Sequence, residues 1–233
     1  MGSEKYITLM ASMPALSTPF AARELPLSRL GLAARLRLLD DDDAQLLDRI
    51  QHVMVWERID ISLPAAEIIR LVDEVMAALD SETLRAVVRE RFELRTVLAA
   101  LRRRRRGESA PPVDLAWGYG RFANHIRRNW TRPHFGLRRA MPWLGEVREL
   151  HDVGSTLRLD QVISRVAWQS LVEAHRAHEF SFDAVVLYVL KYDMIARWLG
   201  RSAPRARKRF DELVAAGLGN YTALATGMAM ERA

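Results

Sequence analysis

Helical periodicity is the feature that most constrains the fold of this chain. Apolar residues recur three and four positions apart through almost all of its 233 residues, a spacing that places them on one face of an α-helix. No stretch shows the strict alternation of apolar and polar residues, bounded by turn residues, that is typical of a half-buried β-strand. We therefore predict an all-α fold, a multi-helix bundle of stacked helical hairpins.

Capping residues and prolines divide this pattern into separate helices. Serine or aspartate precedes several apolar runs, where its side chain can accept hydrogen bonds from the first backbone N–H groups of a helix. The helix at 181–199 is apolar nearly all round, which predicts a central place in the core. The predicted helices are 6–13, 28–39, one starting at the four aspartates 40–43, one opened by Pro64, 82–106, 113–130, one ending near Asp152, 157–178, 181–199 and one from Pro204 to about Ala216.

The balance of charge changes sign in the middle of the chain. Residues 1–100 carry 12 basic and 16 acidic side chains, a balance of −4, and residues 101–233 carry 23 and 13, a balance of +10. The segment 107–112, GESAPP, has the residues that end helices and form loops. We predict an N-terminal lobe over 1–106, a linker over 107–112 and a basic C-terminal lobe over 113–233, or one continuous domain.

Composition and motifs exclude several kinds of chemistry. The absence of cysteine excludes disulfides, thiolate metal sites and thiol catalysis. The chain has no phosphate-binding GxxxxGK[ST] loop and no nucleophile elbow, and Gly118 and Gly120 form a lone G-x-G inside a helical pattern. His175 and His178 supply at most two metal ligands, so we interpret them as surface or helix-end histidines. We expect a protein that is not an enzyme and that uses no cofactor, metal or small-molecule substrate.

The chain also lacks signals for secretion or membrane insertion. Its first residues have no basic region followed by a long apolar region and a cleavage site. No run approaches the ~20 apolar residues that cross a bilayer. We expect a cytoplasmic protein.

Arginine-rich sequence after residue 100 is the main candidate for binding. Five arginines end the predicted helix 82–106, and more follow, with Trp130, His134 and Phe135 among them. Arginine forks pair with carboxylates and phosphates, so this surface suits an acidic protein partner or, with aromatic stacking, a nucleic acid. The predicted contact residues are Arg102, Arg103, Arg104, Arg105, Arg106, Arg127, Arg128, Arg132, Arg138 and Arg139.

Two charged residues among the apolar positions of helix 82–106 have a separate interpretation. Charged side chains of this kind usually lie on the solvated face of a helix and form weak pairs. The alternative is that Glu93 and Arg95 tie this helix to a second helix through a buried network.

Four segments, in order along the chain, resemble one protein family. They are YITLMASMPAL at 6–16, RFELR at 91–95 leading to LAALR at 98–102, FGL at 135–137 and VLKYDMIARW at 189–198. The first is similar to Y-x-x-L-x-A-S-L-P-x-L and the second to F-E-x-x-L-R-N-x-x-A-A-L, although Thr96 stands where that pattern has asparagine. These are patterns of DUF2764, a bacterial family found with V-type ATPase operons.

The resemblance implies a counterpart of the C subunit of V/A-type ATPases, called d in eukaryotes. That protein is an all-helical adaptor that seats the central shaft on the membrane-embedded rotor ring, and this chain is shorter than a typical three-lobed one. We therefore expect a non-catalytic subunit whose partners are the shaft and the ring, cytoplasmic and peripheral to the membrane-bound ATPase. The alternative is a cytoplasmic helical module that binds nucleic acid, and a metalloenzyme based on His175 and His178 is third.

Overall fold

The computed structural model describes residues 2–55, 58 and 63–201, and all of its regular structure is helical. Across these ranges no strand forms, so the prediction of an all-α fold is confirmed. The helix predicted after Pro204 lies outside the described residues. No described helix has the length and apolar character needed to span a bilayer.

The chain divides into two compact units, one made of Met1–Leu16 with Pro26–Asp193 and the other of Ser17–Leu25 with Met194–Ala233. The contacts and sites discussed below lie in the first unit, which ends within the last helix. The lobe boundary at 107–112 stays a prediction. The helical elements are α1 (Gly2–Ala11), α2 (Arg29–Leu36), α3 (Asp41–Met54), α4 (Ala65–Ala78), α5 (Glu82–Arg105), α6 (Ala123–Arg128), η1 (Pro133–Gly136), α7 (Leu144–Asp152), α8 (Thr156–His175) and a last helix described over 182–201.

Local capping sets the starts of the helices as predicted. The side chains of Ser28, Asp40 and Ser81 accept hydrogen bonds of 3.0, 3.0 and 3.2 Å from the backbone N–H three residues later. Pro64 stands immediately before α4. At the other end of α5, Gly107 has φ +76° and stops the helix, because glycine enters this conformation without steric cost.

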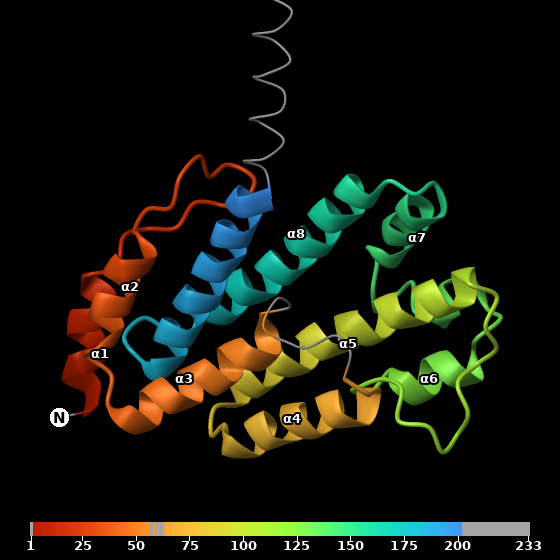
Figure 1. The fold of residues 1–233 in the computed structure, drawn as a ribbon, viewed down its shortest axis with the longest axis horizontal. Coiled ribbons are helices and arrows are strands. Elements are labelled where there is room, and N and C mark those ends of the chain that lie inside the picture. The colour runs from red at the N-terminus through yellow and green to blue at the C-terminus, as the bar shows by residue number, and fades with distance from the viewer. Residues whose placement is uncertain (1, 56–57, 59–62, 202–233) are drawn as a thin grey trace, which may run out of the picture. The chain divides into compact units, whose positions relative to one another are not determined.

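Helix α5 is the centre of the first unit. It packs against α4, α6 and α8, and Figure 1 shows it between α4 and α8. Its buried side chains include Val88, Phe92 and Val97. A helix of 24 residues spans about 36 Å, so α5 runs through much of the unit as a single stiff element.

The last helix is buried on every side over 184–190, which confirms its predicted central place. It is also tied to distant parts of the chain: Tyr188 Oη donates to Pro14 O at 2.9 Å and Tyr192 Oη to Leu27 O at 2.8 Å. Burial raises the pKa of Tyr188 to about 12. These bonds hold the N-terminal segments against a helix more than 150 residues later.

The helix predicted over 113–130 is wrong for its first half. Residues 113–122 form no helix, and only α6 is helical in this range. The reason is tertiary: Gly118 and Gly120 lie against α5, and Gly120 has φ +83°. The G-x-G is therefore part of a loop that packs on α5, not an irregularity inside a helix.

Candidate functional site

The arginine run at the end of α5 is bonded largely to its own chain. Arg104 Nη1 donates to Trp130 O at 3.2 Å and to Arg132 O at 3.0 Å, and its Cζ lies 4.3 Å from the centre of the Phe135 ring. Arg105 Nη1 donates to His151 O at 2.8 Å. These two arginines therefore fasten the end of α5 to the segment around 130–135 and to α7.

Two further arginines of the run pair with Glu108 at the start of the predicted linker. Arg103 Nε and Arg106 Nε lie 2.8 and 2.6 Å from the Glu108 carboxylate, and Arg106, with Arg103, holds the pKa of Glu108 below its ordinary value. Arg102, Arg105 and Arg106 remain exposed to solvent. The run thus combines an internal role with cationic groups at the surface.

The other arginines predicted to contact a partner lie in α6 and in the chain between α6 and α7. Arg127 Nη1 donates to Val113 O at 2.9 Å, and Arg128 Nε donates to Asn124 O at 3.4 Å, within its own helix. Arg132, Arg138 and Arg139 are exposed. Their contact with a partner stays a prediction.

The aromatic residues among these arginines are not on the surface. Trp130 is 8% exposed and Phe135 is fully buried, with Trp130 edge-on to Trp117 at 6.5 Å and 5.5 Å from Phe135. Phe135 lies in a tight turn over 133–137, in which His134 and Phe135 both have φ +52°. The predicted aromatic stacking surface for bases is therefore wrong for Trp130 and Phe135.

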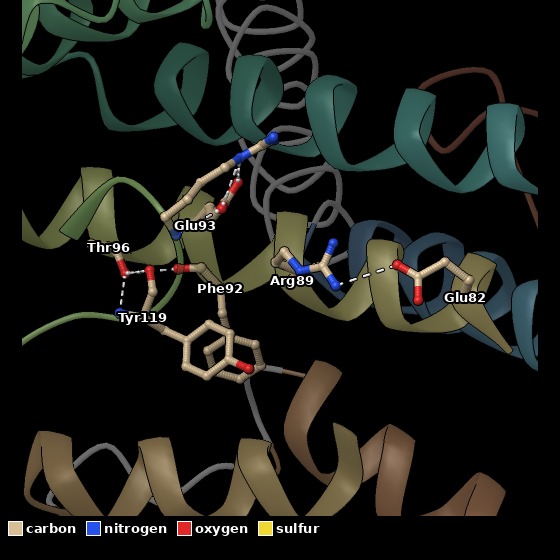
Figure 2. Close-up of polar contacts among 7 residues, drawn as sticks. Glu82, Arg89, Phe92, Glu93, Thr96 and Tyr119 are labelled. Carbon is tan, nitrogen blue, oxygen red and sulfur yellow. Dashed lines mark hydrogen bonds and ion pairs between the residues drawn. The ribbon is translucent and has the colours of Figure 1, made fainter. Parts of the chain in front are cut away.

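Glu93 forms a buried polar connection between α5 and the loop before α6 (Figure 2). Its side chain is 3% exposed and accepts hydrogen bonds from Arg121 N at 3.1 Å and from Arg121 Nε at 3.3 Å. Arg121 lies in a loop, so the bonded partner of Glu93 in the described part of the chain is a loop residue, not a second helix. A buried carboxylate needs such partners, because an unpaired one is costly.

A second connection lies one turn further along α5. Thr96 Oγ1 accepts a hydrogen bond from Tyr119 N at 2.7 Å and lies 3.0 Å from Tyr119 O, and the Tyr119 ring packs edge-on to Phe92 at 5.8 Å. Figure 2 shows Glu93 on one side of α5 and the rings of Phe92 and Tyr119 on the other. Together the two connections bind 118–121 to α5 through side chains and backbone.

Close packing explains the two glycines of this loop. A Cβ added at Gly118 would lie 2.5 Å from Thr96 Cγ2, and one added at Gly120 would lie 2.5 Å from Glu93 Cγ. Only glycine fits at either place without displacement of α5 side chains. We call this contact of 118–121 with α5 the glycine-loop contact. In the sequence, the G-x-G spacing was the available signal for this contact. No sequence pattern indicated the roles of Arg121 and Thr96.

Arg95, predicted to join Glu93 in one network, points to a different side of α5. It lines a cavity with α4 and Trp117, and its Cζ lies 5.2 Å from the centre of the Phe92 ring. Burial, with the nearby Arg102, lowers the pKa of Arg95. Residues two apart on a helix do not face each other, which separates it from Glu93.

The two histidines considered as metal ligands have different hydrogen-bond surroundings. His178 Nε2 lies 3.0 Å from Thr83 Oγ1 and 3.5 Å from Asp183 Oδ2, and Asp183 also accepts a hydrogen bond from Ser81, the N-cap of α5. Both partners approach the same nitrogen of His178. This cluster therefore joins the start of α5 to the start of the last helix.

His175 is enclosed in a different way. Its Nδ1 is buried without a hydrogen-bond partner among the described residues. Within 2–55, 58 and 63–201 no three histidine or acidic side chains gather as a metal site would require. The hypothesis of a metal site on this pair gains no further ligand from the described chain.

Comparison with protein families assigns the chain. The model of DUF2764, described as a protein of unknown function, matches residues 74–217. The chain belongs to the DUF2764 family. Comparison with curated proteins finds no match, and comparison with solved structures finds none.

The family match covers most of the elements described above. It spans the end of α4, all of α5 to α8 and the last described helix. The glycine-loop contact and the arginine run of this DUF2764 protein both lie inside it. The resemblance seen in RFELR at 91–95 falls on Glu93 itself, and that in FGL at 135–137 falls on the turn below Arg104.

His175 predicts a pH dependence for the stability of this DUF2764 protein. Burial, with Lys191 and His178 nearby, lowers the pKa of His175 from 6.5 to about 4. As the pH falls below 6.5, His175 binds a proton in the unfolded chain but not in the folded chain. The contribution of neutral His175 to stability is therefore fully present above pH 6.5 and is lost progressively as the pH falls to about 4. We expect the free energy of unfolding, measured with urea, to fall across this interval.

A variant separates the contribution of His175 to this pH dependence from the contribution of the carboxylates. His175→Phe keeps a ring at the site and removes the titration, so its stability should fall less over the same interval. Equal slopes for the two proteins would contradict the assignment to His175.

Proposed function

We propose that this DUF2764 protein is a non-catalytic subunit associated with V-type ATPases, similar in role to their C subunit and its eukaryotic counterpart d. In this role it couples the central shaft to the membrane rotor ring during ion transport. Membership of the DUF2764 family supports the proposal, because the resemblance described above implies an association with V-type ATPases. The all-α fold is compatible with the helical adaptor that the resemblance implies.

A mechanical adaptor must hold its two contact surfaces at a constant separation. Helix α5 has the properties that this requires: it is long, packed on several sides and bonded at intervals to the loop before α6, to 130–132 and to α7. Its basic end presents exposed arginines, which fit acidic groups of a partner. These features support an adaptor and need no cofactor or substrate.

The proposed place of the protein is the cytoplasmic side of the membrane, where it contacts the ring without entering the bilayer. The proposal includes no enzymatic step. Purified protein is accordingly expected to neither bind nor hydrolyse ATP.

Affinity purification from native cells at moderate salt tests the partners. We expect central-stalk and ring components of the V-type ATPase to be recovered, with cross-links to the shaft or to cytoplasmic loops of the ring. Salt should weaken recovery, because exposed charges are screened. Recovery of ribosomes or nucleic acid alone, in a form that nuclease removes, would instead favour the nucleic-acid-binding alternative.

A further inference from the structure

A cationic pocket lies beside the C-terminal end of α5. It has a volume of about 340 Å³ and is formed by the last turns of α5, by α7 and by the chain at 131–133. Its charged lining consists of Arg104, Arg105, Arg148 and Asp152, three cations against one anion. We call it the α5–α7 pocket. Arg148 was not among the residues predicted to bind a partner.

The arginines of the α5–α7 pocket are held in place by bonds that leave donors for a ligand. The hydrogen bonds of Arg104 and Arg105 within the described chain run from Nη1 to backbone carbonyls. Arg148 Nε lies 3.5 Å from Asp152, one turn away on α7. Since a guanidinium carries five N–H groups, each side chain is oriented and still able to donate.

Two histidines, His151 in the pocket lining and His134 in the neighbouring turn, have lowered pKa values. Burial, followed by Arg148, Arg138 and Arg104, lowers the pKa of His134. Burial and then Arg105 lower the pKa of His151. Both imidazoles are therefore neutral near pH 7, and Asp152 is left as the acidic group of the lining.

The surroundings favour an acidic protein segment over a small oxyanion. A cavity of this volume is of the size that accepts several side chains rather than one ion. The acidic lining residue, Asp152, repels a doubly charged phosphate more strongly than a singly charged carboxylate, and Leu101 and Pro133 give the lining apolar parts. A ligand with carboxylates and neighbouring apolar side chains matches both the charged and the apolar lining.

We propose that the α5–α7 pocket binds carboxylate side chains of an acidic segment of a protein partner. The proposal deepens the function proposed above and rests on it, since the partner is a component of the V-type ATPase. Arg104, Arg105 and Arg148 receive the carboxylates, and Leu101 and Pro133 contact apolar side chains of the same segment.

A matched pair of variants tests the pocket. Arg105→Gln with Arg148→Gln removes two pocket cations and spares Arg104, whose two carbonyl bonds support the fold. Arg158→Gln with Arg165→Gln removes the same charge from exposed positions of α8 that lie outside the pocket lining and are not among the predicted contact residues. The probe is a fluorescein-labelled oligoglutamate peptide, followed by fluorescence anisotropy with full-length protein over a salt series.

The pocket pair should weaken peptide binding at least about tenfold, and the control pair by less than about threefold, because direct charged contacts outweigh screened ones. Equal weakening by both pairs would mean attraction by net charge alone and would overturn the proposal. Displacement of the peptide by inorganic phosphate or by single-stranded RNA at lower concentration than by unlabelled peptide would overturn it too. Thermal unfolding of both pairs verifies that they fold.

Affinity purification with the same variants separates this proposal from the proposed function. Recovery of ATPase components by wild-type protein and their loss with the pocket pair alone supports both. Equal recovery by both pairs overturns the pocket and leaves the function standing. No recovery by wild-type protein, together with peptide binding that depends on Arg105 and Arg148, overturns the function and leaves the pocket as a site for acidic segments.

Discussion

Replacement of Gly120 by alanine is expected to destabilise the protein by about 3 kcal/mol, through two additive causes. The residue has φ +83°, which costs any residue with a Cβ about 1 kcal/mol. The new Cβ would also lie 2.5 Å from Glu93 Cγ and 2.9 Å from Glu93 Oε1, so it would displace a buried carboxylate from its partners. Chemical denaturation with circular dichroism detection measures the change.

Two other glycines separate these causes. Gly107 has φ +76° and nothing within 4 Å of an added Cβ, so Gly107→Ala should cost about 1 kcal/mol from backbone conformation alone. Gly118 meets Thr96 Cγ2 at 2.5 Å without a positive φ, so Gly118→Ala reports crowding alone. If Gly120→Ala cost no more than Gly107→Ala, the close approach of the loop to Glu93 would be refuted.

Replacement of Glu93 by alanine is expected to cost about 3 kcal/mol, because it leaves the Arg121 N–H without its buried acceptor and opens a void beside α5. Glu93→Gln keeps an oxygen for that N–H and should cost about 1 kcal/mol. The same denaturation experiment measures both. Glu146→Ala, at an exposed position in the first turn of α7, is the control and should cost about 0.5 kcal/mol or less.

A variant of Arg121 distinguishes the stabilising contributions of the two hydrogen bonds that Glu93 accepts from this residue. The Arg121 side chain is 67% exposed, so its ion pair with Glu93 is solvated on one side and weak. We expect Arg121→Ala to cost less than about 1 kcal/mol, since the backbone N–H remains. A cost equal to that of Glu93→Ala would show that the ion pair, not the backbone bond, holds the loop.

The arginine run shows how an internal role and a binding role share one sequence feature. Charge counting treats Arg102 to Arg106 as a single basic cluster available to a partner. In the fold, Arg104 bonds two carbonyls and stacks on Phe135, and Arg103 pairs with Glu108. Only a structure separates the cations that close the end of α5 from those that face solvent.

Features that depend on a few neighbouring residues were predictable from the sequence. Ser28, Asp40 and Ser81 cap their helices, and Gly107 ends α5, because capping bonds and backbone conformation reach only three or four residues along the chain. The apolar run at 184–190 indicated a buried helix for the same local reason. The resemblance to DUF2764 also came from the sequence: the family match over 74–217 covers the segments at 91–102, 135–137 and 189–198, and the segment at 6–16 lies outside it.

Features that depend on which segments meet were decided by the tertiary structure. The 113–122 stretch has helical periodicity, yet Gly118 and Gly120 fit under α5 only as a loop bonded to Glu93 and Thr96. Local propensities of a few tenths of a kcal/mol per residue give way to the burial and bonding of such a contact. In the same way Arg148, 43 positions beyond Arg105, joins it in one pocket because α7 packs beside the end of α5. No spacing in the sequence predicts that Arg105 and Arg148 lie close together, because their proximity arises only when the chain is folded.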